Sequence, residues 1–302
     1  MKNILVVLFN LFFGLIVFSQ NGKIISKNLI DLSKTPIWNT ISKNDSLTQE
    51  FSYLKDINFY FISYKSDDLV IDGILSEPKY IGKYPVIIYN RGGNRNFGKL
   101  TVGQLIMTTS KLCSQGYIII ASNYRKIDEF GGSEINDVLS LTETIKELNN
   151  ADSTKIGMLG WSRGGMMAYL AISKSTKFKS VIIGNGPTNL LSLKDDRPEM
   201  EKEVYLECIP NYLKNKEEEL KKRSVIFWVD KLNKNCRLLI LCGTKDDRVN
   251  PKQVDELAEK LNKINYPFEL KKFETDHTFS NKRQELEVEL IKWFNNTLKN
   301  EN

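Results

Sequence analysis

From residue 84 onward, the chain alternates between short apolar runs and longer segments with helical character. The apolar runs predict β-strands at Pro85–Tyr89, Tyr117–Ala121, Ile156–Leu159, Ser180–Ile183, Leu238–Cys242 and Phe268–Phe273. The segments between them predict helices at Val102–Ser114, Glu134–Leu148, Gly164–Ser173, Pro251–Ile264 and Lys282–Leu298. Strands that alternate with helices favour an α/β fold with a mostly parallel sheet covered on both faces. In such sheets, ligands bind at the carboxyl ends of the strands.

A different pattern precedes residue 84. Ile57–Tyr64 and Leu69–Leu75 are predicted strands on either side of the polar residues 65–68, which predicts an antiparallel hairpin. Residues 20–55 are polar and give no assignable structure. Because no Pro/Gly/Ser-rich linker, low-complexity tract or repeat divides the chain, we expect one domain over residues 56–302.

The first residues have the pattern of a targeting segment. Lys2 is followed by an almost continuously apolar run, Ile4–Phe18, which is shorter than the ~20 residues of a membrane-spanning helix. Small residues near Ser19 favour a signal peptide over residues 1–19, and an uncleaved anchor is the alternative. We therefore expect a secreted or periplasmic protein with no stable membrane association after signal removal.

The composition limits the partners, metals and cofactors that we expect. The formal net charge is +6, and lysines alternate with glutamates, so we expect a solvated surface and no nucleic-acid partner. After export, the four cysteines could form up to two disulfides, in a pairing that the sequence leaves open. Their spacing and a single histidine do not match the usual zinc sites, so we expect no metal and no cofactor. These cysteines are Cys113, Cys208, Cys236 and Cys242.

One predicted strand-to-helix junction carries a G-x-S-x-G motif, Gly160-Trp161-Ser162-Arg163-Gly164. Glycines on both sides let a sharp turn close and push the Ser162 hydroxyl out above the sheet. The hydroxyl would lie at a helix N-terminus, whose free N–H groups favour an oxyanion. The motif and its context favour a nucleophilic serine over a glycine-rich packing turn.

A nucleophilic serine requires a base and an acid downstream, in the order Ser, Asp or Glu, His for an α/β-hydrolase. The single histidine, His277, follows the last predicted strand and is the candidate base. Asp246 and Asp247 follow the preceding strand, and either could be the acid. Asp276 adjoins the histidine, but adjacent side chains in an extended loop point apart.

Residues 84–298 resemble the catalytic domain of the prolyl oligopeptidase family of α/β-hydrolases. The resemblance rests on ordered blocks: Gly131–Asp137, Gly160–Gly165, Gly243–Val249 and the pair Asp276-His277. The third block matches the family pattern G-x-x-D-x-x-V, which assigns the triad acid to Asp246. Family members often carry an N-terminal β-propeller, for which the preceding residues are too few, so the resemblance implies the catalytic domain alone.

The loop after the first core strand departs from the family pattern, since it reads Asn90-Arg91-Gly92-Gly93-Asn94 where relatives show His-Gly-Gly or a nearby tyrosine. Gly93 and Arg163 are the candidates for the two backbone N–H donors of an oxyanion hole. Arg91 has two alternatives: a charged donor to the same oxyanion, or a surface ion pair.

Residues 188–234 form a charged insertion before the strand that precedes Asp246, and its position predicts a lid. Residues 214–223 predict a solvated helix. The candidate walls of a substrate pocket, which could equally be core residues, are Tyr205, Leu206, Phe227 and Trp228.

The resemblance implies a serine peptidase that forms an acyl-enzyme. A carboxylesterase acting on small acyl esters is the alternative, because the same fold and triad serve both reactions, and a non-catalytic binding protein is a third reading. Because histidine side chains usually titrate near neutrality, activity should fall as the pH is lowered through about 6 to 7. The substrate's identity and the oligomeric state stay open.

Overall fold

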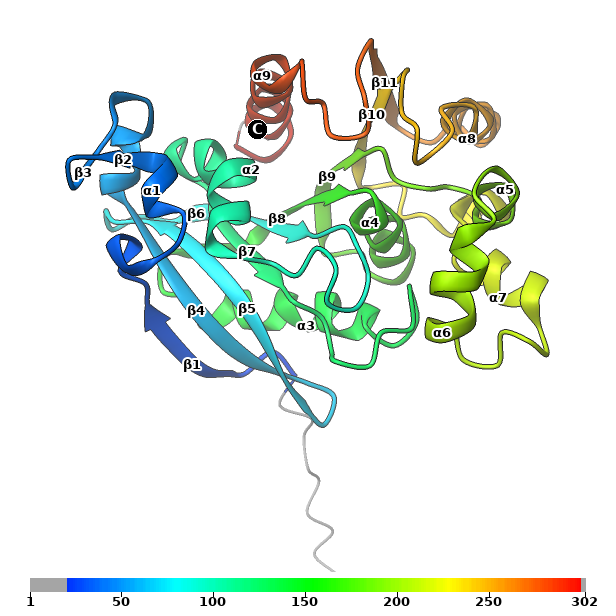
Figure 1. The fold of residues 1–302 in the computed structure, drawn as a ribbon, viewed down its shortest axis with the longest axis horizontal. Coiled ribbons are helices and arrows are strands. Elements are labelled where there is room, and N and C mark those ends of the chain that lie inside the picture. The colour runs from blue at the N-terminus through cyan, green and yellow to red at the C-terminus, as the bar shows by residue number, and fades with distance from the viewer. Residues whose placement is uncertain (1–20, 300–302) are drawn as a thin grey trace, which may run out of the picture.

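The computed structural model describes residues 21–299, so the predicted signal segment 1–19 lies outside the described residues. Its main feature is a nine-stranded sheet with the order β1-β4-β5-β7-β6-β8-β9-β10-β11 (Figure 1). The strands span β1 Ile24–Leu29, β4 Ile57–Ser66, β5 Leu69–Pro78, β6 Tyr84–Asn90, β7 Ile118–Ser122, β8 Ala151–Trp161, β9 Phe178–Gly184, β10 Arg237–Gly243 and β11 Phe268–Phe273.

Strands β6 to β11 pair in parallel, whereas β1, β4 and β5 form the antiparallel part of the sheet. The β4–β5 pair is the predicted hairpin, in register from Ile57 opposite Pro78 to Ser66 opposite Leu69. Every residue of β7 is buried, and so is nearly all of β6, β9 and β10, as expected for parallel strands covered on both faces. The predicted α/β-hydrolase fold is confirmed.

Helices cover both faces of the sheet (Figure 1). They span α1 Trp38–Ile41, α2 Val102–Ser114, α3 Ile135–Thr144, α4 Arg163–Lys174, α5 Leu190–Asp196, α6 Leu206–Cys208, α7 Lys216–Lys222, α8 Lys252–Lys263 and α9 Arg283–Phe294. Short 3₁₀ turns span Leu32–Lys34, Ile145–Glu147, Val225–Phe227 and Val229–Lys231, and a longer 3₁₀ segment spans Gln49–Asp56. π-Helical turns span Glu201–Tyr205 and Asn295–Lys299.

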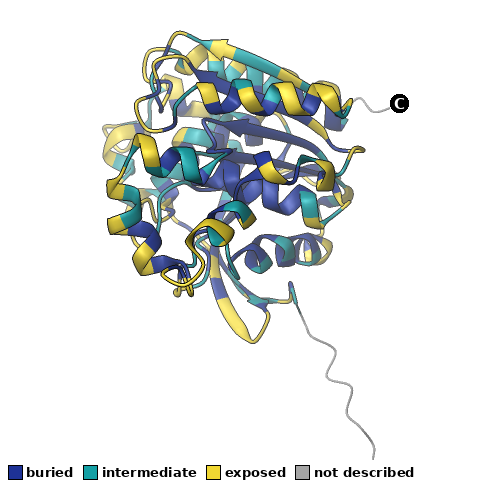
Figure 2. Cartoon of the chain, turned by 90° about the vertical axis from the view of Figure 1, so that its right-hand side faces the viewer, coloured by how far each residue is buried: buried dark blue, intermediate teal, exposed yellow. Residues whose placement is uncertain are grey.

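Two apolar cores result from the alternation of side chains along the strands. In β6, Val86 and Ile88 pack in the core beneath α3, α4 and α8, whereas Ile87 and Tyr89 pack in the core beneath α2 and α9. Figure 2 shows the consequence: the central strands are buried, and the covering helices expose only their outer sides. The two cores fix the strand ends, and with them the loops that carry the site.

The segment before the hairpin, which the sequence left unassigned, is structured from residue 21 onward. Its strand β1 pairs antiparallel with β4, and a small two-stranded sheet is formed by β2 (Ser42–Lys43) and β3 (Ser46–Leu47). Ile41, Phe51 and Leu54 are buried in the core beneath α2. Residues 21–56 therefore complete the edge of the sheet instead of forming a separate unit.

The insertion at residues 188–234 contains α5, α6 and α7 and lies beside α4 and α8 (Figure 1). The predicted solvated helix is present as α7, whose three successive glutamates, Glu217 to Glu219, all form ion pairs or face solvent. The insertion is anchored by buried apolar residues, among them Val204, Tyr205 and Leu220.

The possible disulfides are not formed in this structure: all four cysteines are free and buried. Each lies in an apolar core, Cys113 in the one beneath α2 and α9, and Cys208, Cys236 and Cys242 in the other. They therefore pack as small apolar side chains. In residues 21–299, no helix is long and apolar enough to cross a membrane.

Candidate active site

Ser162 lies at the turn between β8 and α4, with a left-handed backbone φ of 55°. This conformation is unusual for a residue with a side chain and is characteristic of a strained functional turn. The turn is held by a hydrogen bond from the Ser162 N–H to the Gly184 carbonyl (2.9 Å) and one from the Gly165 N–H to the Ser162 carbonyl (2.8 Å). Ser162 therefore occupies a fixed position at the carboxyl edge of the sheet.

The two glycines of the motif are required by space. A Cβ at Gly160 would lie 2.3 Å from the Gly164 carbonyl oxygen, and a Cβ at Gly164 would lie 1.9 Å from the Asn90 carbonyl oxygen at the end of β6. Because both obstacles are backbone atoms, no side-chain movement could relieve the clash. The glycines let α4 begin directly against β6, which brings the serine beside the loop that follows that strand.

His277 and Asp246 meet at the same edge of the sheet. The His277 Nδ1 lies 2.7 Å from Oδ2 and 2.9 Å from Oδ1 of Asp246, and both side chains are almost fully buried. The Asp246 carboxylate also accepts hydrogen bonds from the N–H groups of Arg248 (2.8 Å) and Val249 (3.0 Å). The carboxylate is thus held in place and orients the imidazole ring.

The loop that carries His277 is fixed through its backbone. The His277 carbonyl accepts hydrogen bonds from the Trp161 indole N–H (3.0 Å) and from the Asn185 side-chain amide (2.9 Å). The Asn185 side-chain oxygen accepts from the Gly243 N–H (2.8 Å), so one asparagine after β9 joins the ends of β9 and β10 to the histidine loop. Sequence reasoning missed Asn185, although its place directly after a buried strand was a usable signal.

The candidate nucleophile and its candidate base are not joined directly. Among residues 21–299, no hydrogen bond joins the Ser162 hydroxyl to the His277 ring. Catalytic hydrogen bonds in ligand-free enzymes are often long and tighten only when substrate binds. The backbone hydrogen bonds from Trp161 and Asn185 keep the histidine loop against the turn that carries Ser162.

The other two candidate acids lie apart from the imidazole. Asp247 is exposed. Asp276 accepts hydrogen bonds from Ser280 and Thr278 and closes the turn after His277. These donors, with the Ser280 hydroxyl contributing most, hold the pKa of Asp276 well below its usual range. The structure therefore places only Asp246 of the three carboxylates beside the ring.

A cavity of about 330 Å³ opens in front of Ser162. Its lining consists of Gly93, Asn94, Phe97, Phe130, Ser162, Arg163, Pro187, Leu193, Arg197, Met200, Arg248 and Val249. The lid insertion contributes Leu193, Arg197 and Met200. The sequence suggested four other lid residues as pocket walls, and that suggestion is wrong for this cavity because none of the four lines it.

The wrong pocket walls have a physical explanation. Tyr205 and Trp228 point into the apolar core, and Leu206 and Phe227 lie on the surface with about two-fifths of their area exposed (42% and 43%). In a compact insertion, apolar side chains first satisfy the insertion's own packing against the sheet. Which of them faces the cavity depends on how the short helices are arranged.

The oxyanion-hole candidates Gly93 and Arg163 lie on either side of the serine. Gly93 has a φ of +75°, which only glycine adopts easily, and a Cβ on the neighbouring Gly92 would lie 3.2 Å from the Ser162 Cβ. Arg163 is the first residue of α4, so its N–H has no partner within the helix. Both residues line the cavity that contains Ser162.

Arg91 has neither of its two anticipated roles. Its guanidinium is buried and donates to the backbone carbonyls of Gly92 (3.0 Å), Asn123 (3.1 Å) and Arg95 (3.2 Å). Burial lowers the pKa of Arg91. The side chain therefore acts as an internal brace that shapes the loop after β6, and it does not line the cavity.

The Arg163 side chain forms a buried ion network that sequence reasoning missed. It donates to Asp128 at 2.7 and 2.8 Å, to Glu134, and to the Gly93 carbonyl at 3.0 Å. Burial acts to lower the pKa of Arg163, but the charges of Glu134 and Asp128 outweigh it and raise that pKa. The residue after the nucleophile is thus tied directly to the glycine of the opposite loop.

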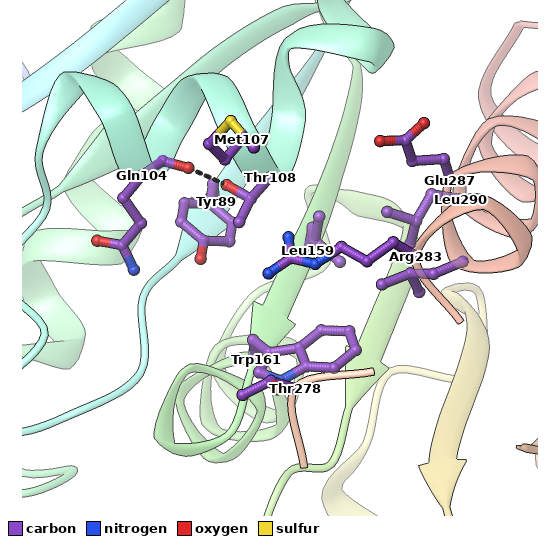
Figure 3. A pocket seen from close by; sticks show the side chains of 11 residues that line it. Tyr89, Gln104, Met107, Thr108, Leu159, Trp161, Thr278, Arg283, Glu287 and Leu290 are labelled. Carbon is purple, nitrogen blue, oxygen red and sulfur yellow. Dashed lines mark hydrogen bonds between the residues drawn. The ribbon is translucent and has the colours of Figure 1, made fainter. Parts of the chain in front are cut away.

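A second pocket, of about 290 Å³, lies behind the serine turn between α2 and α9 (Figure 3). Trp161 and Leu159 of β8 form part of its floor, and Figure 3 shows Arg283 of α9 extending across it. Thr278, the residue after the histidine, also lines it. Trp161 lines this pocket and does not line the cavity in front of Ser162.

Residues 21–299 contain no group of three His, Cys, Asp or Glu side chains that could hold a metal ion. The chemistry available at this edge of the sheet is that of a serine hydroxyl, an imidazole–carboxylate pair and backbone N–H donors. Together these groups can perform acyl transfer through a covalent serine intermediate.

The chain is similar to a known protein family and to several known peptidases. Residues 104–301 match the model of the prolyl oligopeptidase family. An uncharacterized peptidase of Bacillus subtilis, YtmA, is 27% identical over 249 residues, which cover 80% of this chain and 94% of that protein. Dipeptidyl-peptidase 5 of Porphyromonas gingivalis is 32% identical over 124 residues, 36% of this chain and 18% of that protein.

Among solved structures, the acylaminoacyl peptidase of Pyrococcus horikoshii is similar, with a TM-score of 0.70 and 25% identity. The match covers 85% of this chain and 45% of that protein's chain. The chain thus spans nearly all of the Bacillus protein but less than half of the solved peptidase.

Proposed function

The chain belongs to the prolyl oligopeptidase family, and from this premise we propose that it is an exported serine peptidase that cleaves peptide bonds through Ser162, Asp246 and His277. One observation carries the proposal: the Asp246–His277 pair lies at the edge of the sheet where Ser162 stands in its strained turn. Family membership makes the chain a serine hydrolase. We propose the triad and the peptide substrate in addition to family membership.

In the proposed mechanism, the His277 Nε2 removes the proton from the Ser162 hydroxyl as its oxygen attacks the carbonyl carbon of the substrate. Asp246 holds Nδ1–H and stabilises the imidazolium that forms. The N–H groups of Gly93 and Arg163 stabilise the oxyanion. His277 then gives its proton to the leaving amine, and water releases the acyl group by the reverse sequence of proton transfers.

The cavity in front of Ser162 supports a peptide substrate. Apolar side chains from the lid and from the loops after β6 and β10 give it walls for a substrate side chain. Asn94, Arg197 and Arg248 add polar groups at the same cavity. A short acyl ester would leave much of this lining without contacts.

Activity-based labelling tests the triad. We expect a fluorophosphonate probe to label the wild type, to fail with Ser162→Ala and to label His277→Ala far more slowly, because the serine requires its base. Lys214→Ala, on the exposed lid surface, serves as control. Labelling that persists in Ser162→Ala would contradict the assignment of the nucleophile, and an unlabelled wild type would favour a non-catalytic binding protein.

Substrate comparison tests the reaction. We expect hydrolysis of aminoacyl or peptidyl amides, with esters of the same acyl group also cleaved because they carry better leaving groups. Ester hydrolysis without amide hydrolysis would overturn the peptidase proposal and favour the carboxylesterase.

Export rests on the sequence of residues 1–19, which supports a cleavable signal. Expression of the full chain in a secreting bacterial host, followed by N-terminal sequencing, tests it. We expect a mature N-terminus at Gln20 outside the cytoplasm; an intact Met1 terminus retained in the cell would contradict the proposal.

A further inference from the structure

The cavity in front of Ser162 has an uneven distribution of charge. Three arginines line it, Arg163, Arg197 and Arg248, and no aspartate or glutamate does. Arg197 comes from the lid, at the end of α5, and Arg248 comes from the loop after β10, two residues beyond Asp246. These two arginines therefore approach the cavity from separate segments of the chain.

Arg163 contributes little to this positive charge. Its side chain is 3% exposed, and its guanidinium is paired with both Asp128 and Glu134, so its charge is neutralised within the protein. The pair also fixes the guanidinium away from solvent. An anionic ligand in the cavity would therefore depend on Arg197 and Arg248.

Arg248 is available to a ligand. It is exposed, and in the part of the chain that the structure describes no carboxylate forms an ion pair with it. Its backbone N–H donates to Asp246, which fixes the position of the residue while the side chain stays free. The guanidinium thus starts from a rigid anchor next to the proposed triad.

The Arg197 guanidinium already forms one ion pair, and that ion pair is weak. Its Nε lies 2.8 Å from Glu199, whose side chain is about half exposed (47%), and its Nη1 donates to the Arg248 carbonyl at 3.5 Å. Exposed ion pairs between residues so close in sequence contribute little stability, because water competes with both partners. A substrate carboxylate could therefore replace Glu199 or share the guanidinium with it.

The remaining walls strengthen the attraction of an anion. Phe97, Phe130, Leu193, Met200 and Val249 are apolar and exclude water from one side of the cavity. Electrostatic attraction grows as the surroundings become less polar. A carboxylate that enters with an apolar neighbour would satisfy both parts of the lining, and guanidinium groups suit carboxylates through paired N–H donors.

We propose that Arg197 and Arg248 make the enzyme selective for peptides that carry a carboxylate within reach of the scissile bond. The carboxylate comes from an acidic side chain beside that bond or from the free C-terminus of a short peptide. This inference rests on the proposed peptidase function and adds the substrate class to it.

Two matched substrate pairs test the inference and separate the two sources. The first pair consists of end-blocked fluorogenic peptides that differ only in Glu or Gln next to the scissile bond. The second pair consists of a short neutral peptide with a free C-terminal carboxylate and the same peptide with a C-terminal amide. We expect kcat/KM to be about tenfold higher for the carboxylate member of at least one pair.

The source of selectivity is tested with Arg197→Gln, Arg248→Gln and the double variant. We expect each single variant to reduce the carboxylate preference and the double variant to bring the ratio near one. Arg237→Gln is the matched control, because Arg237 is exposed at the start of β10, at the opposite end of that strand from Gly243. It should keep the wild-type ratio.

Ionic strength provides a measurement that needs no variant. The preference of the wild type should shrink as salt is raised, since the arginines face a solvent-connected cavity. Equal kcat/KM within both pairs, or a preference for the neutral members, would overturn this inference and leave the peptidase function standing. Failure to cleave any of the four peptides would overturn the proposed function and this inference with it.

Discussion

At the residue scale, the site depends on a few residues whose conformation or size is fixed by their immediate neighbours. Ser162 adopts a left-handed conformation because Gly160 and Gly164 remove the side chains that would block the turn. Asp246 is held by two backbone N–H donors, so the carboxylate that faces His277 cannot turn away without losing both. The orientation of the imidazole therefore comes from the loop after β10.

The two adjacent aspartates of that loop provide a matched test. We expect Asp246→Asn to reduce kcat by a factor on the order of 10³ to 10⁴, because an amide neither fixes the imidazole tautomer nor stabilises its cation. Asp247→Asn makes the same chemical change on an exposed side chain and should leave kcat within about twofold. Steady-state kinetics on one peptide amide gives both values, and a similar loss in the two variants would refute the assignment of Asp246.

At the element scale, buried arginines join the loops around the serine. Arg91 holds the loop after β6 through backbone carbonyls, and Arg163 links α4 to Asp128 and Glu134 in the segment between β7 and α3. Asp128 in turn accepts the Arg95 N–H of the first loop. These contacts join the loop after β6, the loop after β7 and α4, and they link the residues Gly93 and Arg163 that we propose as oxyanion donors.

The Asp128 carboxylate, which takes part in these contacts, makes the free energy of unfolding depend on pH. Burial acts to raise its pKa, but the Arg163 charge and the N–H donors of Arg95 and Phe130 outweigh burial and lower it. The folded state therefore favours the carboxylate, and its stabilisation is complete above about pH 4 and is lost as the pH falls toward the lowered pKa. We expect Asp128→Asn to cost about 3 kcal/mol at pH 7 and less at pH 3.

Urea unfolding at pH 7 and pH 3 measures both free energies. The control is Glu207→Gln, which removes the exposed partner of Arg95 and should change the free energy of unfolding by less than about 1 kcal/mol at either pH. An Asp128→Asn cost that is equal at the two pH values would show that its charge plays no part.

At the scale of the whole molecule, an apolar core on each face holds the sheet in place, and the loops at its carboxyl edge carry the site. Most apolar residues of the lid pack into the core, and Leu193, Arg197 and Met200 are the lid residues that line the cavity. The cysteines belong to the cores as well. Burial raises the pKa of Cys113 and of Cys236 to about 12 in each case, and that of Cys242 to about 11.

These buried thiols lead to an expectation for the intact protein. A thiol reagent should find no reactive cysteine in the native state and four after denaturation, because a neutral buried thiol is neither nucleophilic nor accessible. Dithiothreitol should leave the thermal midpoint unchanged. A shift of several degrees with the reductant, or fewer than four thiols after denaturation without it, would reveal a disulfide.

The prediction from sequence succeeded where local pattern decides the outcome. The helix at residues 102–114 and the strand at 268–273 have their predicted limits, because apolar periodicity and capping residues act over short distances. The hairpin and the strand-turn-helix around Ser162 were predictable for the same reason. The segment at 21–56 was missed because strand β1 owes its pairing to β4, which lies more than thirty residues away.

The sequence by itself determined the alternation of strands and helices, the motif around Ser162 and the candidates His277 and Asp246, since each depends on neighbours in the chain. Only the tertiary structure decided which carboxylate faces the imidazole, that Arg91 braces a loop, that the cysteines stay apart and that Arg197 and Arg248 meet at one cavity. These properties depend on the packing of segments distant in sequence, whose relative positions no local pattern specifies.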